Sequence, residues 1–506
     1  MNQLPAIMVR AATVVAAASA AATLAQTPCG ATHYGTGTAG SGSVVPTIAA
    51  TDLPLIGNAN FALRGSALLG GSWTIRLLGL ARANTSVLGI DLLVNAPDLL
   101  ASIATGAGNG SGQSTFALPI PPTPTLAGLA LYSQLVTLDA GAASGFAASD
   151  GLTFTLRQNN LLGATSAYQG GAGSDAFSAI HYLGNGRILA GKRSSQANNR
   201  FLRSLDYGAT WQVIGCPGST GSHTYFFGQN GQTVLSGTGD NGNACLMRST
   251  DSGASWTVAL TFSDLQQLTG SNSPRAVFSP VHTGSGNWLV NIKCLDSINS
   301  ILASTDDGQT WQLPAAQPGS GTSAWARQMI QTGDGVLLWP ETLSNKMFRS
   351  DDRGASWTPA TVPGAALFQP LCDAGSGIYI AGDATASANT EIRLHRSVDR
   401  GLTWTTVASV NLQLPGTTYW RDVIRAGDAL YASACCLEGT TNQRFMQLFR
   451  SVDDGASWCS LGNPFIGPYG GMQATYQMCV TELHEVFAAC QPDSTIIRWQ
   501  VPPGGQ

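Results

Sequence analysis

Carboxylic acids recur through the second part of this 506-residue chain, each after a short apolar run and 42 to 56 residues from the next. They are Asp240, Asp296, Glu341, Asp383, Glu438 and Asp493. Two carboxyl groups that face one cleft can cleave a glycosidic bond, one as general acid and the other as general base or nucleophile. We take Asp240, Glu341, Asp383 and Glu438 as candidate catalytic acids. For each of them, a solvated or turn-forming role is the alternative.

Each of these apolar runs follows an earlier apolar run, and the residues that lead into the earlier run add further polar and aromatic groups. They are Asp175, His223, Arg275, Trp325, Arg327, Trp420, Arg421 and Asp422. An indole ring can stack on a sugar ring, and a guanidinium can pair with the carboxylate of an acidic sugar. We therefore predict substrate contacts from Arg275, Trp325, Arg327, Trp420 and Arg421. Packing between strands is the alternative for the two tryptophans.

A repeated motif must position these residues. Six segments read Ser-x-Asp-x-Gly-x-(Ser/Thr)-Trp, which we call the repeated box. Its aspartates are Asp206, Asp251, Asp306, Asp352, Asp399 and Asp453, spaced 45 to 55 residues apart. A fixed period in this range indicates a solenoid, a propeller or an array.

The box reads as a tight turn between two antiparallel strands. Its glycine can take a positive φ, and its Asp and Ser/Thr side chains can bond backbone groups that a turn leaves unpaired. One small sheet cannot bury the tryptophan alone, so we expect each indole to pack against the neighbouring repeat.

The repeat length leaves room for four strands, which is one blade of a β-propeller. After the last box, Ile497-Arg498-Trp499 aligns with the strands that precede the other boxes. We predict seven blades, the last completed by an early strand within Leu161–Gln169. A six-bladed ring with residues 459–506 as an appendage is the alternative.

Composition narrows the class of protein. The chain is 43% hydrophobic and 11% charged, with a net charge of −4 and only three lysines, which argues against a nucleic-acid partner.

The first 25 residues resemble an export signal whose apolar run is too short to span a membrane, so we expect a secreted, extracellular or periplasmic protein. The ten cysteines suggest disulfides plus some buried thiols. No phosphate loop, dinucleotide fingerprint or metal-ligand spacing occurs, so we expect no cofactor and no metal.

The region before the repeats has a different texture. Alternating apolar and polar residues in 116–120 and 152–156 indicate half-buried strands. We predict a small β-sandwich over 26–158, a linker over 159–174 and the propeller over 175–506. The whole chain is thus predicted to be all-β.

The repeated box resembles the Asp-box, or bacterial neuraminidase repeat. That repeat occurs in sialidases, in xyloglucan-degrading hydrolases, in sortilin-type receptors and in a photosystem assembly factor, and it lies on the face opposite the ligand site. Sialidases also carry a Phe/Tyr-Arg-Ile-Pro segment, which this chain lacks. They use three arginines to bind the substrate carboxylate, and Arg275, Arg327 and Arg421 are the candidates for such a triad here. The seven-blade count is closer to the xyloglucan hydrolase and sortilin types. Segments 54–57 and 149–152 resemble a sandwich module of planctomycete-type bacteria.

Two hypotheses follow. The first is an exported glycoside hydrolase that acts on extracellular glycans or polysaccharides. The second is a non-catalytic propeller that binds glycans or proteins at the cell surface. The carboxylates favour the first, whereas the missing sialidase segment and the low charge favour the second.

Overall fold

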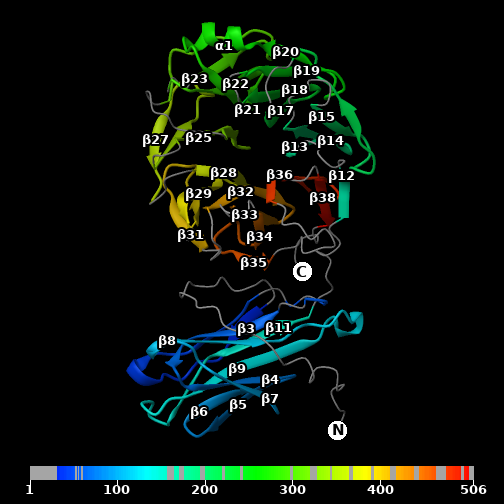
Figure 1. The fold of residues 1–506 in the computed structure, drawn as a ribbon. Helices are drawn as coiled ribbons and strands as arrows, with labels where there is room; N and C mark the ends of the chain where they lie inside the picture. Colours follow the sequence, from blue (N-terminus) through cyan, green and yellow to red (C-terminus); the bar gives the residue numbers. More distant parts are fainter. Residues whose placement is uncertain are drawn as a thin grey trace. The chain divides into compact units, whose positions relative to one another are not determined.

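The computed structural model describes residues 31–500 apart from 52–53, 55, 59–60, 157–164, 170–175, 194–199, 219–222, 240–242, 297–299, 319–327, 342–344, 364–367, 389–391, 411–416, 438–443, 463–473 and 492–494. The chain forms two compact units: Met1–Asn159 with the short segment Cys459–Gly462, whose strand is given below with the sheet it pairs in, and the remainder from Asn160 onward. Almost all regular elements in the described part are strands, as the alternating and β-branched runs predict (Figure 1).

The first unit is built from β1 (Ala31–Tyr34), β2 (Thr47–Ala50), β3 (Ala62–Gly70), β4 (Trp73–Gly79), β5 (Arg82–Val87), β6 (Ile90–Val94), β7 (Asp98–Ile103), β8 (Gly108–Ala117), β9 (Ala130–Leu138), β10 (Phe146–Ala148) and β11 (Gly151–Thr155), with 3₁₀ turns η2 (Ser41–Ser43) and η3 (Pro124–Leu126). One sheet has the order β1-β11-β9-β4-β7, with β10 on β9, and a second has the order β2-β3-β8. Strands β5 and β6 form a hairpin.

These two sheets of the first unit share one apolar core. Phe61 and Phe116 from the smaller sheet's side pack with Leu135 and Phe154 of the larger sheet. The rings of Phe61 and Phe154 lie 5.1 Å apart. The alternating burial that this packing requires is the pattern seen in the sequence, while the sandwich class itself stays a prediction.

The second unit consists of consecutive antiparallel strands in groups of three or four, and two pairs of neighbouring groups are joined further into a seven-stranded and an eight-stranded sheet. The groups are β13 (Phe177–Gly184), β14 (Arg187–Lys192), β15 (Phe201–Ser204) and β16 (Gln212–Ile214); β17 (His223–Asn230), β18 (Thr233–Gly239), β19 (Leu246–Ser249) and β20 (Thr257–Leu260); β21 (Pro274–Gly284), β22 (Asn287–Cys294) and β23 (Ser300–Ser304); β24 (Ile330–Gln331), β25 (Leu337–Glu341), β26 (Lys346–Ser350) and β27 (Thr358–Thr361); β28 (Phe368–Gly375), β29 (Ile378–Ala388), β30 (Ile392–Ser397) and β31 (Thr405–Val410); β32 (Thr417–Ala426), β33 (Ala429–Leu437), β34 (Arg444–Ser451) and β35 (Cys459–Gly462); and β36 (Ala474–Val480), β37 (Glu485–Gln491) and β38 (Thr495–Gln500).

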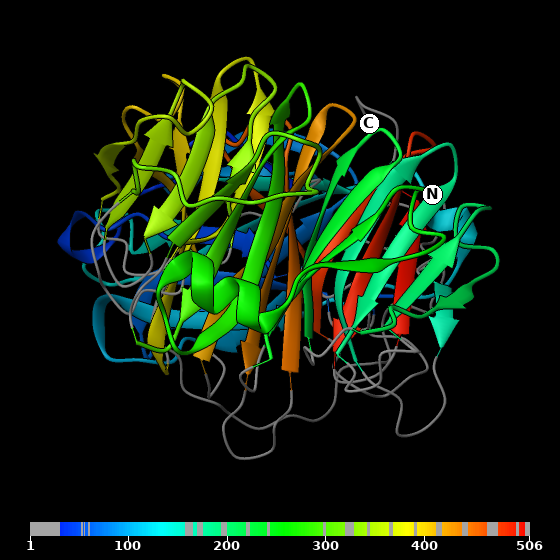
Figure 2. The same cartoon turned by 90° about the horizontal axis from the view of Figure 1, so that it is seen from above.

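The last group is completed by a strand from far earlier in the chain. β12 (Thr165–Gln169) pairs antiparallel with β38, giving the order β12-β38-β37-β36. An early strand within Leu161–Gln169 is therefore present. The first strand of that first group, β13, contacts both β17 and β36, so the sheets surround a common centre with their first strands innermost (Figure 1). Figure 2 shows these strands running nearly along one axis, with the helix α1 (Phe262–Thr269) at the outside. This arrangement is a β-propeller, and the all-β prediction is confirmed.

The repeated box is a turn held by its own side chains. The Ser304 hydroxyl donates to Asp306 at 2.8 Å, and the backbone N–H of Gly308 donates to the Ser304 oxygen at 2.9 Å. The Thr310 N–H and hydroxyl donate to the two Asp306 oxygens at 2.8 and 2.6 Å. Gly308 has φ +81°, as predicted. Asp307 also has a positive φ, +61°, which the sequence pattern does not reveal because this position of the six boxes holds Tyr, Ser, Asp or Arg.

The box tryptophans join successive sheets, as predicted. The indole of Trp256 stacks on Phe201 of the preceding sheet, with ring centroids 4.4 Å apart. Each of the other five indoles also lies in a core cluster that combines residues of its own group of strands with residues of the neighbouring group. Trp211 packs in this way against the sheet of β36–β38, so the same kind of indole contact joins the last group of strands to the first.

The acid behaviour of the box can be tested at Asp306. Hydrogen bonds from the Thr310 hydroxyl and N–H, and then from Ser304, lower the pKa of Asp306 from 3.8 to about 2. A depressed carboxyl pKa adds stability that is present above the unfolded pKa and is lost as the pH falls through the folded pKa. We therefore expect the difference in unfolding free energy between the wild type and Asp306→Asn to shrink from pH 4 to pH 2 in urea titrations. A difference that stays constant over this range would contradict the assignment.

The described cysteines include a disulfide-bonded residue and buried thiols. Cys459 is disulfide-bonded. Free buried thiols in the described part are Cys216, Cys245, Cys294, Cys372, Cys435, Cys479 and Cys490.

Candidate functional site

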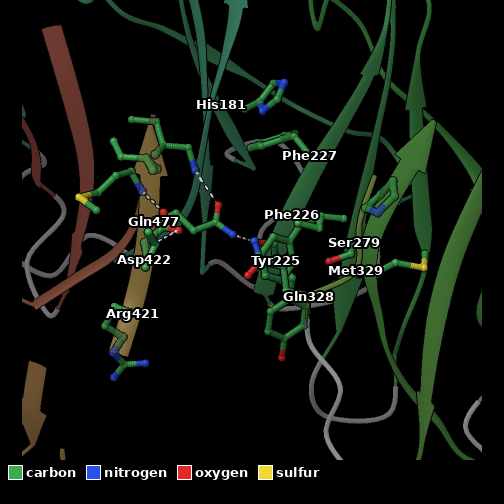
Figure 3. Close-up of a pocket in the computed structure, with 16 residues that line it drawn as sticks. His181, Tyr225, Phe226, Phe227, Ser279, Gln328, Met329, Arg421, Asp422 and Gln477 are labelled. Atoms are coloured by element: carbon green, nitrogen blue, oxygen red, sulfur yellow. Dashed lines mark hydrogen bonds between the residues drawn. The ribbon is translucent and has the colours of Figure 1, made fainter. Parts of the chain in front are cut away.

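A cavity of about 250 Å³ lies at the centre of the propeller. Its described walls come from the innermost strands β13, β17, β21, β32 and β36 and from the residues at the start of β24 (Figure 3). Tyr225, Phe226 and Phe227 supply aromatic surface on one side, and Arg421 and Asp422 supply charged groups on another. A concave site with apolar walls and a few polar groups is the usual form of a small-ligand site.

Backbone bulges turn these side chains toward the cavity. The pairing register shifts in β17 between Thr224 and Phe227, and in β32 between Trp420 and Asp422. Similar shifts occur in β13, β21, β28 and β36. A bulge gives one strand an extra residue and re-aims its side chains, and bulges are common beside functional sites. Without bulges, the side chains of each inner strand would alternate regularly, and every second one would face the centre.

Asp422 is the acidic group of the cavity wall, and it is 8% exposed. Its oxygens accept hydrogen bonds from the backbone N–H of Met478 at 2.6 Å and of Val423 at 2.9 Å. Burial raises its pKa from 3.8 to about 7, against the opposite effect of these two hydrogen bonds. Asp422 can therefore hold a proton near neutral pH. In the sequence, Asp422 is only one of several polar residues ahead of the inner strands.

Two glutamine side chains cross between strands of different sheets beside the cavity. Gln477 accepts from the N–H of Ile180 at 3.2 Å and donates to the carbonyl of Tyr225 at 2.9 Å (Figure 3). Gln328 accepts from the N–H of Leu371 at 2.7 Å and donates to the carbonyl of the same residue. Among the described residues, no backbone hydrogen bonds join these neighbouring sheets at the cavity, so the two side-chain amides satisfy backbone groups across the gap instead.

The remaining polar groups set the charge of the cavity. Arg421 is half-buried, and its Nε donates to the sulfur of Cys435 at 3.0 Å. Burial lowers the pKa of His181, despite its hydrogen bond with Gln229, so this ring is neutral at pH 7. The cavity thus offers aromatic faces, one guanidinium and one proton-holding carboxyl. Hydrolysis of a glycosidic bond uses two carboxyl groups, and Asp422 is the one carboxyl on the described walls.

The candidate acids do not meet in this cavity. Glu341 ends β25 opposite Lys346 and is half-buried. Asp383 is 1% exposed inside its own sheet, where the N–H of Arg393 donates to it and His395 Nε2 lies 3.5 Å away. This burial favours a structural role for Asp383. Asp240 and Glu438 lie outside the described residues.

Of the candidate substrate contacts that the structure describes, one lines the cavity and two do not. Arg421 lines the cavity, whereas Arg275 is the second residue of β21 and does not line it. Trp420 is 1% exposed and packs edge-on against Phe449 in the core, so the packing alternative fits its position. Trp325 and Arg327 lie outside the described residues.

The fold and this cavity together define a β-propeller with a ligand-sized central site. Among curated proteins, the chain is similar to a xyloglucanase from a Paenibacillus species, with 31% identity over 258 residues that cover 44% of this chain and 24% of the relative. It is also similar to the xyloglucanase Xgh74A of Acetivibrio thermocellus, with 28% identity over 160 residues, 26% of this chain and 18% of the relative. The matches thus span a quarter or less of those relatives. No family model matches the chain.

Solved propellers are similar at lower identity. The xyloglucanase of Xanthomonas campestris has 16% identity and a TM-score of 0.47, over 65% of this chain and 52% of that one. YCF48 bound to D1 peptide has 13% identity and a TM-score of 0.46, over 67% of this chain and 96% of that one. Within the described part, no helix has the length and hydropathy to cross a bilayer, and no three His, Cys, Asp or Glu residues gather as metal ligands.

Proposed function

We propose that this protein is a carbohydrate-active propeller that hydrolyses a β-glucan-type polysaccharide. The sequence similarity to xyloglucanases carries the proposal, since it extends over 258 residues of the chain. The proposal includes an Asp-box propeller of seven blades, which the pairing of β12 with β38 supports. It also includes an exported location and a first unit that serves as a spacer or attachment module.

The reaction would take place on the face opposite the boxes. Ser350 opens a box at the end of β26, and the β25–β26 register places Glu341 at the other end of the same hairpin. We propose Glu341 as one acid and the sequence candidates Asp240 and Glu438 as its possible partners. Arg421 would contact the sugar chain from the cavity wall.

A non-catalytic propeller that binds glycans is the second candidate. The observation in its favour is that the described cavity wall holds a single carboxyl group, Asp422, with both oxygens already engaged by backbone amides. Aromatic side chains and a guanidinium suffice for binding a sugar.

The test is to incubate the purified full chain with xyloglucan, with unsubstituted β-glucan and with sialylated glycans, and to measure new reducing ends. We expect release from xyloglucan. Because a positioned acid or base contributes about 10²- to 10⁴-fold, Glu341→Gln should lower the rate by at least about a hundredfold.

The matched control is Glu482→Gln. Glu482 accepts a hydrogen bond from Tyr207 of the first box and is exposed, so it lies on the box side of the propeller. Its substitution should leave the rate unchanged. Retained binding of xyloglucan without any cleavage would favour the second candidate, and full activity of Glu341→Gln would reject the assignment of this acid.

A further inference from the structure

Side-chain bridges between neighbouring sheets converge on strand β36. On one side, Asp422 of β32 accepts the N–H of Met478 at 2.6 Å. On the other side, Gln477 bonds the N–H of Ile180 in β13 and the carbonyl of Tyr225 in β17. Figure 3 shows these bonds in a row beside the cavity. A carboxyl and an amide thereby tie four inner strands together.

This row of hydrogen bonds crosses from sheet to sheet. β32, β36, β13 and β17 belong to four different sheets, so no backbone ladder joins them. The sheet of β36 is also the one completed by β12, whose residues precede those of β38 by more than 300 positions. The bridges therefore hold the sheet that closes the ring.

We propose that Asp422 and Gln477 form a latch that holds the closing sheet β12-β38-β37-β36 against its neighbours, and that the latch loosens when Asp422 loses its proton. This inference goes beyond the proposed hydrolysis and does not depend on it.

The groups around Asp422 explain why its ionised form is unfavourable here. Cys479 of β36 and Cys372 of β28 are buried thiols whose pKa values are raised by burial and then by the Asp422 charge itself, so both are neutral. Across the cavity stand His181, which is neutral because burial lowers its pKa, and the phenol of Tyr225.

The two arginines on the same strand have other partners. Arg421 Nε donates to Cys435, and Arg425 pairs with Asp454 at 2.9 Å. Burial of a carboxyl without a paired charge favours its protonated form. Because the folded pKa of about 7 lies above the ordinary 3.8, the closed ring binds the proton more tightly than an opened one. The stabilisation is complete below pH 3.8 and is lost as the pH rises toward 7.

Hydrogen exchange of the substrate-free full chain, read by mass spectrometry, tests the latch. The exchange rates of peptides from β36 are first corrected for intrinsic exchange. The corrected rates should increase between pH 5 and pH 7 by at least tenfold and at most roughly a hundredfold, and they should stay constant above pH 7. Peptides from β21 and β22 serve as the internal reference and should lack this slope.

Three variants make the test specific. Asp422→Asn should abolish the slope in β36, whereas Asp383→Asn, a second buried carboxyl that lies in β29 and does not bond β36, should leave it intact. Gln477→Ala should increase exchange in β36 and β13 at every pH while the slope remains. A slope that persists in Asp422→Asn, a slope shared by all sheets, or unchanged β36 protection in Gln477→Ala would overturn the proposal. None of these outcomes bears on polysaccharide cleavage, because no substrate is present.

Discussion

Replacement of Trp256 by alanine is expected to destabilise the propeller by about 3–5 kcal/mol, the range for removing a large aromatic ring from a core. Trp256 is 4% exposed and stacks on Phe201, and it contacts Phe227 and Val258 within the joint between two sheets. The loss combines the transfer of the indole to water with a cavity that two separate sheets cannot readily fill. Urea unfolding of the full chain, followed by fluorescence and circular dichroism, measures this loss.

Leu402→Ala is the matched control for this prediction. Leu402 also belongs to a box but is 57% exposed, so its truncation should change stability by no more than about 0.5 kcal/mol. Trp256→Phe should fall between the two, because a smaller ring can still stack on Phe201. If Trp256→Ala and Leu402→Ala prove equally mild, the box tryptophan does not join the sheets energetically.

Removal of β12 is expected to open the ring. We compare a chain that starts at Asn160, which keeps β12, with one that starts at Gly170, which lacks it. The shorter chain loses the bonds to β38 and the contacts of Tyr168 with Phe177 and Trp211, whose rings lie 5.6 and 6.4 Å away. Each hydrogen bond contributes about 1 kcal/mol, and a fully buried aromatic ring about 1.5–3 kcal/mol, of which the half-buried Tyr168 supplies a part, so the loss is about 5 kcal/mol.

The readouts are urea unfolding and size-exclusion chromatography of both chains. Without β12, the edge of β38 is left unpaired, and an unpaired edge invites association with other chains. The shorter chain should therefore be both less stable and partly associated, whereas the longer chain should behave as a single species. Equal stability of the two chains would show that β12 does not contribute to closure.

The candidate site was predicted only in part. The sequence placed Arg421 near a ligand site and it lines the cavity, but it gave Asp422 no special role. Trp420, the neighbour of Arg421, points into the core instead, because the register shift between Trp420 and Asp422 alters the alternation of β32. Strand alternation can be anticipated from a sequence, whereas a bulge depends on what the neighbouring strands allow.

The amino-acid sequence alone determined the all-β class, the turn at each box and the role of its tryptophan. It could do so because the box bonds join residues only two to four positions apart, as from Ser304 to Gly308, and six copies repeat the same local solution. Tertiary structure decided the cavity, the burial of Asp422 and the bridges of Gln477. These depend on strands from different sheets, such as Ile180 and Gln477, which are 297 residues apart, and no local pattern encodes which side chains such strands bring together.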